Sequence, residues 1–157
     1  METSSPHFKY FIGCDHAGFD MKELIKKYLQ SKMIEIEDCG VYKPDRCDYP
    51  DIAAKVSLEV AKNPKHRGIL VCGSGIGISI AANKFKGIRC ALCHDDYTVK
   101  NAVEKEYCNM IALGGRVLGD KLALSIVEFF VSKGEYVEDE NYKEKMKEYA
   151  ILEEKYL

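Results

Sequence analysis

The chain has 157 residues, a hydrophobic fraction of 46% and a formal net charge of −2, which fits one globular domain. The near-balance of charge disfavours nucleic acid and anionic membranes as main partners, because both bind basic faces. No apolar run reaches the ~18 residues of a membrane span, and the first residues do not have the pattern of a signal peptide. The seven cysteines predict reduced thiols in the cytoplasm, because a chain of this size does not need disulfides.

Short β-rich runs alternate with helical periodicity along the chain. The expected strands are Lys9–Cys14, Met33–Glu37, Gly68–Cys72, Gly87–Leu92 and Asn109–Leu113. The expected helices are Phe19–Lys32, Asp51–Lys62 (opened by Pro50), Ile76–Phe85, Asp95–Glu106, Gly119–Lys133 and Tyr142–Tyr156. This alternation predicts an α/β fold with a five-stranded parallel sheet covered on both faces. We expect one domain over residues 1–157, with a flexible N-terminus (1–8) and a C-terminal helical extension (137–157).

Ligands of such sheets bind at the carboxyl ends of the strands, where strand order reverses. The residues that directly follow the strands are therefore the candidates for a functional site. They are Cys14-Asp15-His16-Ala17-Gly18, Cys72-Gly73-Ser74-Gly75-Ile76-Gly77 and Gly114-Gly115-Arg116.

Three alternating glycines, at positions 73, 75 and 77, lead into the third expected helix. Such a turn exposes backbone N–H groups beside a helix N-terminus and can bind an anion. The segment lacks the lysine of a P-loop and does not match the dinucleotide-binding fingerprint. A plain turn is the alternative interpretation.

Cys72 is the last residue of the expected strand and lies directly before this turn. Proximity to a helix N-terminus increases the thiolate fraction of a cysteine. A thiolate beside backbone donors can remove a proton α to a carbonyl while the donors hold the enediolate oxygen, and the Ser74 hydroxyl could assist. A buried, unreactive cysteine is the alternative interpretation.

Two other loops carry polar candidates. Asp15 and His16 could contact sugar hydroxyls and move the ring-opening proton, or they could be a helix-capping Asp and an exposed His. Arg116 is suited to bind a phosphate, or it could be a solvated surface arginine.

Cys90 and Cys93 form a C-x-x-C pair next to His94, but we expect neither a metal site nor a redox site there. Residues three apart on a strand point to opposite faces, so the two thiols should not converge. No other cysteine pair has the spacing of a metal site, and we expect no metal and no cofactor.

The last helix carries an apolar stripe formed by Tyr142, Met146, Tyr149 and Leu152. The stripe indicates either contact with another copy of the chain or packing within one chain, and the pattern alone does not choose between them.

Several segments resemble the B-type ribose-5-phosphate isomerase family, which also contains the galactose-6-phosphate isomerase subunits. They are Gly13–Gly18 (GCDHAG), Asp48–Pro50 (DYP), Cys72–Lys84 (CGSGIGISIAANK) and Gly114–Arg116 (GGR). The resemblance runs from about residue 9 to about residue 135 and implies a three-layer Rossmann-like sandwich. It also implies a homodimer or homotetramer with shared active sites. The implied reaction is a cofactor-free interconversion of ribose 5-phosphate and ribulose 5-phosphate through a cis-enediolate.

The resemblance also implies roles for individual residues. Cys72 would be the base, and Ser74 with the amides of Gly73 to Gly77 would hold the enediolate. Asp15, His16 and Tyr49 would contact the substrate, and Arg116 would reach a phosphate in the partner's site. The implied catalytic residues are Cys72, Ser74 and Asp15, and the implied substrate-binding residues are Asp15, His16, Tyr49, Gly73, Ser74, Gly75, Ile76, Gly77 and Arg116.

The sequence departs from the family pattern at two places. Lys105 and Glu106 stand where the family has a His-Asn pair that serves ring opening, and Asp15 could take over that step. The tail from Glu138 to Lys145 is acidic where the family has arginines that bind phosphate. Lys143 or Lys145 could stand in for them. Otherwise the chain acts on a six-carbon sugar phosphate, or is a weakly active partner in a hetero-oligomer. Outside the isomerases, a flavodoxin-like ligand sensor and a thiol redox protein are the alternatives.

Overall fold

The computed structural model describes residues 8–133, 136 and 138–157. Five parallel strands form one sheet in the order β2-β1-β3-β5-β4. The strands are β1 (Lys9–Cys14), β2 (Ile36–Asp38), β3 (His66–Cys72), β4 (Cys90–Leu92) and β5 (Met110–Gly114). The helices are α1 (Phe19–Ser31), α2 (Tyr49–Ala61), α3 (Ile76–Ala82), α4 (Asp96–Glu104), α5 (Asp120–Lys133) and α6 (Glu140–Tyr156), with a 3-10 turn, η1, over His16–Gly18. The predicted α/β fold with a parallel sheet is confirmed.

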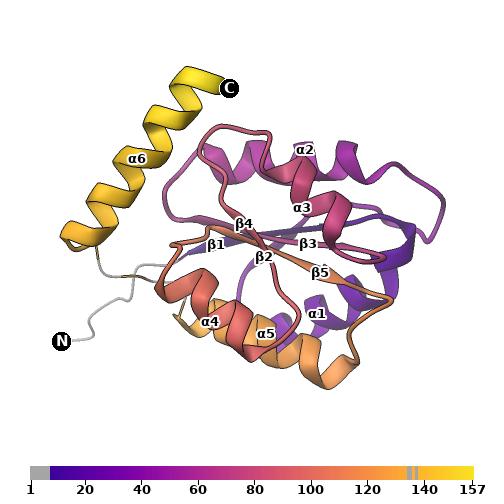
Figure 1. Cartoon of the computed structure of the whole chain (residues 1–157). Coiled ribbons are helices and arrows are strands. Elements are labelled where there is room, and N and C mark those ends of the chain that lie inside the picture. The colour runs from indigo at the N-terminus through magenta and orange to yellow at the C-terminus, as the bar shows by residue number, and fades with distance from the viewer. Residues whose placement is uncertain (1–7, 134–135, 137) are drawn as a thin grey trace.

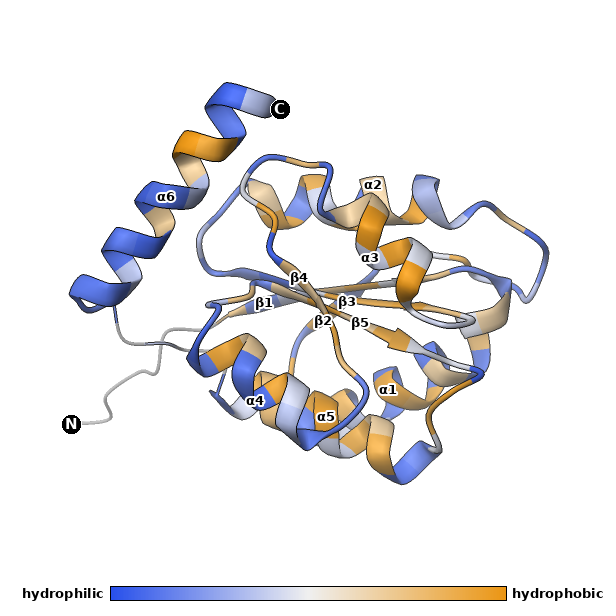
Figure 2. Ribbon diagram, in the orientation of Figure 1, coloured by the Kyte–Doolittle hydropathy of each residue, from blue (hydrophilic) through white to orange (hydrophobic). Residues whose placement is uncertain are grey.

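The sheet lies between two layers of helices. Helices α2 and α3 cover one face, and α1, α4 and α5 cover the other (Figure 1). Apolar residues lie on the sheet and on the helix faces turned toward it (Figure 2). Side chains of β3 alternate between the two layers, so that Ile69 and Val71 pack under α1 and α5 while Leu70 and Cys72 pack under α2 and α3.

Helix α6 stands away from this sandwich (Figure 1), and none of its residues is buried. Of its predicted apolar stripe, Tyr142, Met146 and Tyr149 are half-buried, whereas Leu152 is 53% exposed. The stripe therefore packs partly within the chain and is partly uncovered. No helix in the described part of the chain is both long and apolar enough to cross a membrane.

The carboxyl ends of the three central strands lie at one edge of the sheet. Cys14 at the end of β1 pairs with Val71, and Cys72 at the end of β3 pairs with Gly114 at the end of β5. The loops that follow these strands must therefore start side by side, at the edge where parallel sheets bind ligands.

The predicted strand Met33–Glu37 is wrong at its start, since β2 begins only at Ile36. Met33 has a φ of 57° and is 93% exposed. The amides of Lys32, Met33 and Ile34 donate to carbonyls in the last turn of α1. These residues complete the helix end and are not available to a strand.

The predicted strand Gly87–Leu92 is also too long. The backbone at its start forms hydrogen bonds with a side chain, that of Asn109, and does not pair with another described strand. Asn109 accepts a hydrogen bond from Arg89 N at 2.9 Å and donates to Gly87 O at 2.7 Å. The backbone before Cys90 is thus bonded to an amide side chain, and β4 begins only where this contact ends.

The predicted helix Ile76–Phe85 ends early, at Ala82, for a similar reason. The Asn83 amide donates to Ser79 O and to Cys90 O, and its oxygen accepts from Cys90 N. This side chain caps the end of α3 and ties it to the start of β4. The ends of the other predicted elements agree with the structure to within two residues. Of the predicted N-terminal segment 1–8, only Phe8 lies within the described residues, where it packs against the core.

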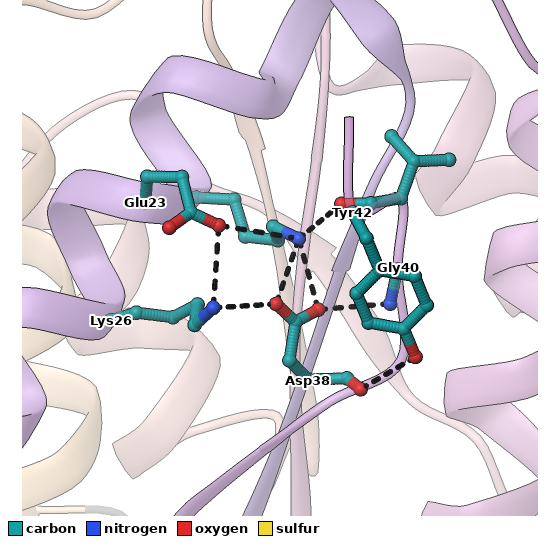
Figure 3. Close-up of polar contacts among 7 residues, drawn as sticks. Glu23, Lys26, Asp38, Gly40 and Tyr42 are labelled. Carbon is teal, nitrogen blue, oxygen red and sulfur yellow. Dashed lines mark hydrogen bonds and ion pairs between the residues drawn. The ribbon is translucent and has the colours of Figure 1, made fainter. Parts of the chain in front are cut away.

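A buried ion-pair network joins α1 to the end of β2 (Figure 3). The Lys22 side chain is fully buried, and its Nζ atom donates to both carboxylate oxygens of Asp38, at 2.9 Å each, and to the carbonyl of Val41. Lys26 donates to Asp38 at 2.7 Å, and Gly40 N donates to the same carboxylate at 2.9 Å. Burial alone would raise the pKa of Asp38, but the hydrogen bonds from Lys26, Lys22 and Gly40 outweigh it and hold the pKa below its ordinary value of 3.8.

We therefore expect Asp38→Asn to lower the free energy of unfolding by about 3 kcal/mol at pH 7, because it leaves the buried Lys22 ammonium with only the longer ion pair to Glu23, at 3.6 Å. A carboxyl whose pKa is lower in the folded state contributes stability above its unfolded pKa, and this is lost as the pH falls through the folded pKa. The difference between wild type and variant should be full above about pH 5 and should shrink below about pH 4. Urea unfolding from pH 3 to pH 7 measures it. A difference that stays constant with pH would contradict the ionised pairing.

Candidate active site

The loops after β1, β3 and β5 are in direct contact. Gly115 N donates to Cys72 O at 2.7 Å, and Arg116 N donates to Gly73 O at 2.9 Å. A Cβ atom on Gly115 would lie 2.9 Å from Ala17 O, and one on Gly18 would lie 2.5 Å from Val71 O. Only glycine permits these approaches. The structure thus brings together the three segments that the sequence indicated.

Cys72 lies at the centre of this cluster. Its side chain is buried, and its Sγ atom accepts a hydrogen bond from Gly75 N at 3.1 Å. The register of β3 turns this side chain to the α2–α3 face of the sheet. The hydrogen bond from Gly75 N holds the sulfur in place. A thiol in a fixed position can take a proton from a bound substrate and return it.

The glycine loop turns sharply around the sulfur. Gly75 has a φ of +79°, and a Cβ atom there would lie 2.6 Å from Leu92 Cδ1. Ile76 N, at the start of α3, donates to Ser74 Oγ at 3.2 Å. The amides of Gly75 and Ile76 are therefore engaged within the loop, and this leaves the amides of Gly73, Ser74 and Gly77 as the candidate donors to a substrate oxygen.

Asp15 and His16 begin the loop after β1. The buried Asp15 accepts hydrogen bonds from Ala17 N at 2.9 Å and Gly18 N at 3.1 Å through one oxygen, Oδ1. It thereby caps η1, as the capping interpretation predicted. Its second oxygen takes no part in this cap. The Nδ1 atom of His16 is buried and has no hydrogen-bond partner among the described residues, which is unusual for a buried ring nitrogen.

Tyr49 and Arg116 border the glycine loop from either side. A Cβ atom on Gly77 would lie 2.7 Å from Cζ of Tyr49, so the tyrosine ring covers this glycine. A Cβ atom on Gly73 would lie 3.6 Å from Cδ of Arg116, and Arg116 is exposed. All the predicted site residues therefore lie at one edge of the sheet, and the predicted reach of Arg116 into a partner's site stays a prediction.

Comparison with known proteins agrees with this geometry. A family model described as Ribose/Galactose Isomerase matches residues 10–149. The chain belongs to the ribose/galactose isomerase family. It is 43% identical over 120 residues to ribose-5-phosphate isomerase B of Escherichia coli strain K12, which covers 76% of this chain and 80% of that protein. It is 42% identical over 118 residues to D-erythrulose-4-phosphate isomerase of Pectobacterium atrosepticum, which covers 74% of this chain and 77% of that protein.

The same relationship holds for the fold of this ribose/galactose isomerase family member. The structure of ribose-5-phosphate isomerase B from Clostridium thermocellum superposes with a TM-score of 0.86 at 39% identity, and the match covers 96% of this chain and all of that chain. The predicted family and the Rossmann-like sandwich are confirmed.

The two departures from the family pattern lie on the surface. Lys105 and Glu106 follow α4 and are exposed, and Glu106 Oε2 accepts a hydrogen bond from Tyr149 on α6 at 3.3 Å. The acidic tail begins before α6, where Asp139 accepts from Tyr142 N and caps the helix. These residues therefore have structural contacts of their own in this family member.

The segment between β2 and α2 had no predicted role before Asp48, and the structure places it beside the site. The Cys47 side chain packs against the core under α2 and α3, and burial raises the pKa of its thiol. The signal that could have indicated this contact is the position of Cys47, directly before the Asp48–Pro50 motif of the family resemblance.

The remaining cysteines fit structural roles. Cys90 packs under α2 and α3, whereas Cys93 packs on the opposite face, which confirms that the two thiols do not converge. Burial raises the pKa of Cys14, Cys93 and Cys108 to about 12, so these thiols react slowly in the folded protein. In the described ranges, no three His, Cys, Asp or Glu side chains come together as a metal-binding group.

Proposed function

We propose that this sugar-phosphate isomerase interconverts ribose 5-phosphate and ribulose 5-phosphate. The observation that carries the proposal is the position of Cys72. In a chain of this family, its sulfur lies at the end of a central strand, in contact with the glycine loop and beside the loops that follow β1 and β5. A base beside oxyanion donors is the arrangement that proton transfer α to a carbonyl requires.

The proposed reaction moves one proton between two carbons. The Cys72 thiolate takes the proton from C2 of the open-chain aldose, which gives a cis-enediolate. The hydroxyl proton on O2 passes to O1, and the thiol returns a proton to C1. The Ser74 hydroxyl and the free loop amides donate hydrogen bonds to the oxygen that becomes negative. The carbon skeleton and the oxidation level of the whole molecule are unchanged, so the reaction requires no metal and no cofactor.

The other site residues bind and prepare the sugar. We assign substrate contacts to Asp15, His16, Tyr49 and Arg116, together with the loop from Gly73 to Gly77. Arg116 is suited to the phosphate, because a guanidinium can donate two parallel hydrogen bonds to it. Asp15 is proposed for ring opening, since its second oxygen is not part of the η1 cap.

A four-carbon substrate is the second candidate. A relative that is 42% identical is named D-erythrulose-4-phosphate isomerase, and exposed Lys105 and Glu106 occupy the positions of the ring-opening pair that the family resemblance implies. A tetrose that carries phosphate on O4 has no hydroxyl able to close a furanose ring, so its isomerase has no ring to open.

The test is a substrate series with the purified chain in the presence of EDTA. We expect conversion of ribose 5-phosphate to ribulose 5-phosphate, and its loss in Cys72→Ala. Conversion of D-erythrulose 4-phosphate at a kcat/KM at least tenfold higher would favour the four-carbon substrate. Activity only on galactose 6-phosphate would favour the six-carbon alternative. A folded chain that converts none of the three would contradict the proposal, unless a second subunit restores activity.

We further propose a single domain over residues 1–157, a homodimer or homotetramer with shared sites, and a location in the cytoplasm. Exposed Leu152 and Tyr156 on α6 and Leu157 directly after it support the oligomer, and they line a cavity of about 600 Å³ between α6 and the β4 edge. All seven cysteines are unpaired, which supports a reducing compartment.

A further inference from the structure

The ion-pair network around Lys22 lies at the start of the segment 39–48, which runs from the end of β2 to α2. We infer that Lys22 is a positioning residue of the substrate site: its buried ammonium holds the segment 39–48 across the carboxyl end of β1, over the Asp15–His16 loop. The inference rests on the proposed function, because it assumes that the ligand of that site is a sugar phosphate.

The first step concerns what Lys22 holds. Its Nζ atom donates to the carboxylate of Asp38, which precedes Gly40, and to the carbonyl of Val41, which follows Gly40. Aromatic rings enclose the ammonium as well, since the centroids of the Phe19 and Tyr42 rings lie 5.4 and 5.6 Å from Nζ. The Tyr42 hydroxyl donates back to the Asp38 carbonyl at 3.1 Å. Figure 3 shows Asp38 between Lys26 and Gly40, with the Tyr42 ring close by.

The second step concerns what this segment does to β1. Gly40 O accepts from Cys14 N at 2.8 Å, and Val41 N donates to Cys14 O at 3.0 Å. The strand pairing thus continues past the end of β2 as far as Cys14, which directly precedes Asp15. The bond from Lys22 to the Val41 carbonyl therefore fixes the backbone from which the Asp15–His16 loop starts.

The third step follows the segment to the site. Cys47 is partly buried and packs against the core under α2 and α3, and Tyr49, the first residue of α2, covers Gly77 of the glycine loop. The segment therefore runs from the Lys22 anchor, along Cys14 at the end of β1, to the far side of the Cys72 loop. On this path it carries Lys43 and Arg46, both exposed and neither in an ion pair with another described residue. Lys43 and Arg46 are therefore available to a phosphate dianion, as Arg116 is.

The chain offers a matched control in Lys26. Both lysines bind Asp38, but Lys26 is 22% exposed at its side chain and makes no contact with Val41 or the two rings. In Lys22→Met the Asp38 carboxylate keeps Lys26 as its partner, so no buried charge is left unpaired. Lys22→Met thus removes the anchor of the segment, whereas Lys26→Met removes only a counter-charge.

The test uses Cys47 as a reporter of the segment. The native protein is labelled with iodoacetamide at pH 8, and the rate at each cysteine is measured by mass spectrometry. We expect Cys47 to be labelled at least tenfold faster in Lys22→Met than in wild type. In Lys26→Met the labelling rate of Cys47 should rise less than twofold. Buried Cys90, Cys93 and Cys108 report global unfolding and should stay unlabelled in both variants. Steady-state kinetics should show KM for the sugar phosphate about tenfold higher in Lys22→Met, with kcat within threefold of wild type.

Equal labelling of Cys47 and an equal KM in Lys22→Met and wild type would overturn the inference. If Lys22→Met also exposes Cys90, Cys93 and Cys108, Tyr42→Ala decides, because Tyr42 is 70% exposed and its loss spares the core. Tyr42→Ala should label several-fold faster at Cys47, and unchanged labelling would overturn the inference. If wild type converts no sugar phosphate, the proposed function fails separately. The labelling rates of Cys47 still test the inference in that case, and the Kd of inorganic phosphate for wild type and each variant replaces KM.

Discussion

Replacing Cys72 by serine should lower kcat for sugar-phosphate isomerisation by about 10³-fold, because a positioned acid–base group contributes 10²- to 10⁴-fold and an alcohol is a far weaker acid than a thiol. Serine is close in size to cysteine and can still accept from Gly75 N, which bonds Sγ in the wild type at 3.1 Å. We therefore expect the free energy of unfolding to change by less than about 1 kcal/mol. KM should change little, since the substrate contacts remain. Steady-state kinetics and urea unfolding measure the two effects.

Cys93→Ala is the control for loss of a buried thiol. Cys93 is fully buried on the opposite face of the sheet, so its loss should cost about 1 kcal/mol of stability and leave kcat within twofold. If the Cys72→Ser variant keeps more than a tenth of the wild-type kcat, Cys72 is not the base.

Gly75→Ala should be strongly destabilising. At a φ of +79° an alanine is strained by about 1–2 kcal/mol. Its Cβ would lie 2.6 Å from Leu92 Cδ1 and 2.9 Å from the Leu113 carbonyl carbon, and such overpacking costs about 1–3 kcal/mol. We expect a total loss of about 3 kcal/mol and an activity about 100-fold lower, because the displaced loop no longer directs Gly75 N at the sulfur. Urea unfolding and kcat/KM are the measurements.

Two other glycines separate the causes. Gly87 has a φ of +77°, and no atom lies within 4 Å of the place that a Cβ atom would take, so Gly87→Ala measures the backbone strain alone. Gly119 has open space and no unusual φ, so Gly119→Ala should be nearly neutral. If Gly75→Ala is no more destabilising than Gly87→Ala, the loop is not packed against Leu92 and β5 as the structure has it.

The arrangement of the site was predictable from local sequence signals. Cys14, Cys72 and Gly114 each end an apolar run, and parallel strands place such ends at one edge of a sheet. The glycines at 73, 75 and 77 marked a turn, and the structure needs the one at 75 for its φ of +79°. The opposite orientation of Cys90 and Cys93 followed from the period of two along a strand.

The ends of the short elements were not predictable, because side chains distant in sequence set them. β4 starts late since Asn109, 20 residues beyond Arg89, binds the backbone of the loop before it. No pattern of hydrophobicity around Gly87 carries that information. The early end of α3 depends in the same way on Asn83 and its contact with Cys90.

The burial of Lys22 was predictable from the sequence, but its partner was not. It lies three residues before Ile25 and seven before Leu29, both fully buried, so the helical period places it on the apolar face of α1. A lysine at such a position requires a buried counter-charge. Its partner, Asp38, lies 16 residues away and becomes identifiable only once β2 is placed beside β1.

The central claim is that Cys72 moves a proton through an enediolate, and isomerisation of ribose 5-phosphate in D₂O tests it most directly. A thiol base exchanges its proton with solvent, so the account predicts that deuterium accumulates at C1 of ribulose 5-phosphate over repeated turnovers, and that Cys72→Ser loses conversion and deuterium incorporation together. Conversion without any deuterium in the ketose would indicate a direct hydride shift. That result, or undiminished incorporation in Cys72→Ser, would contradict the account.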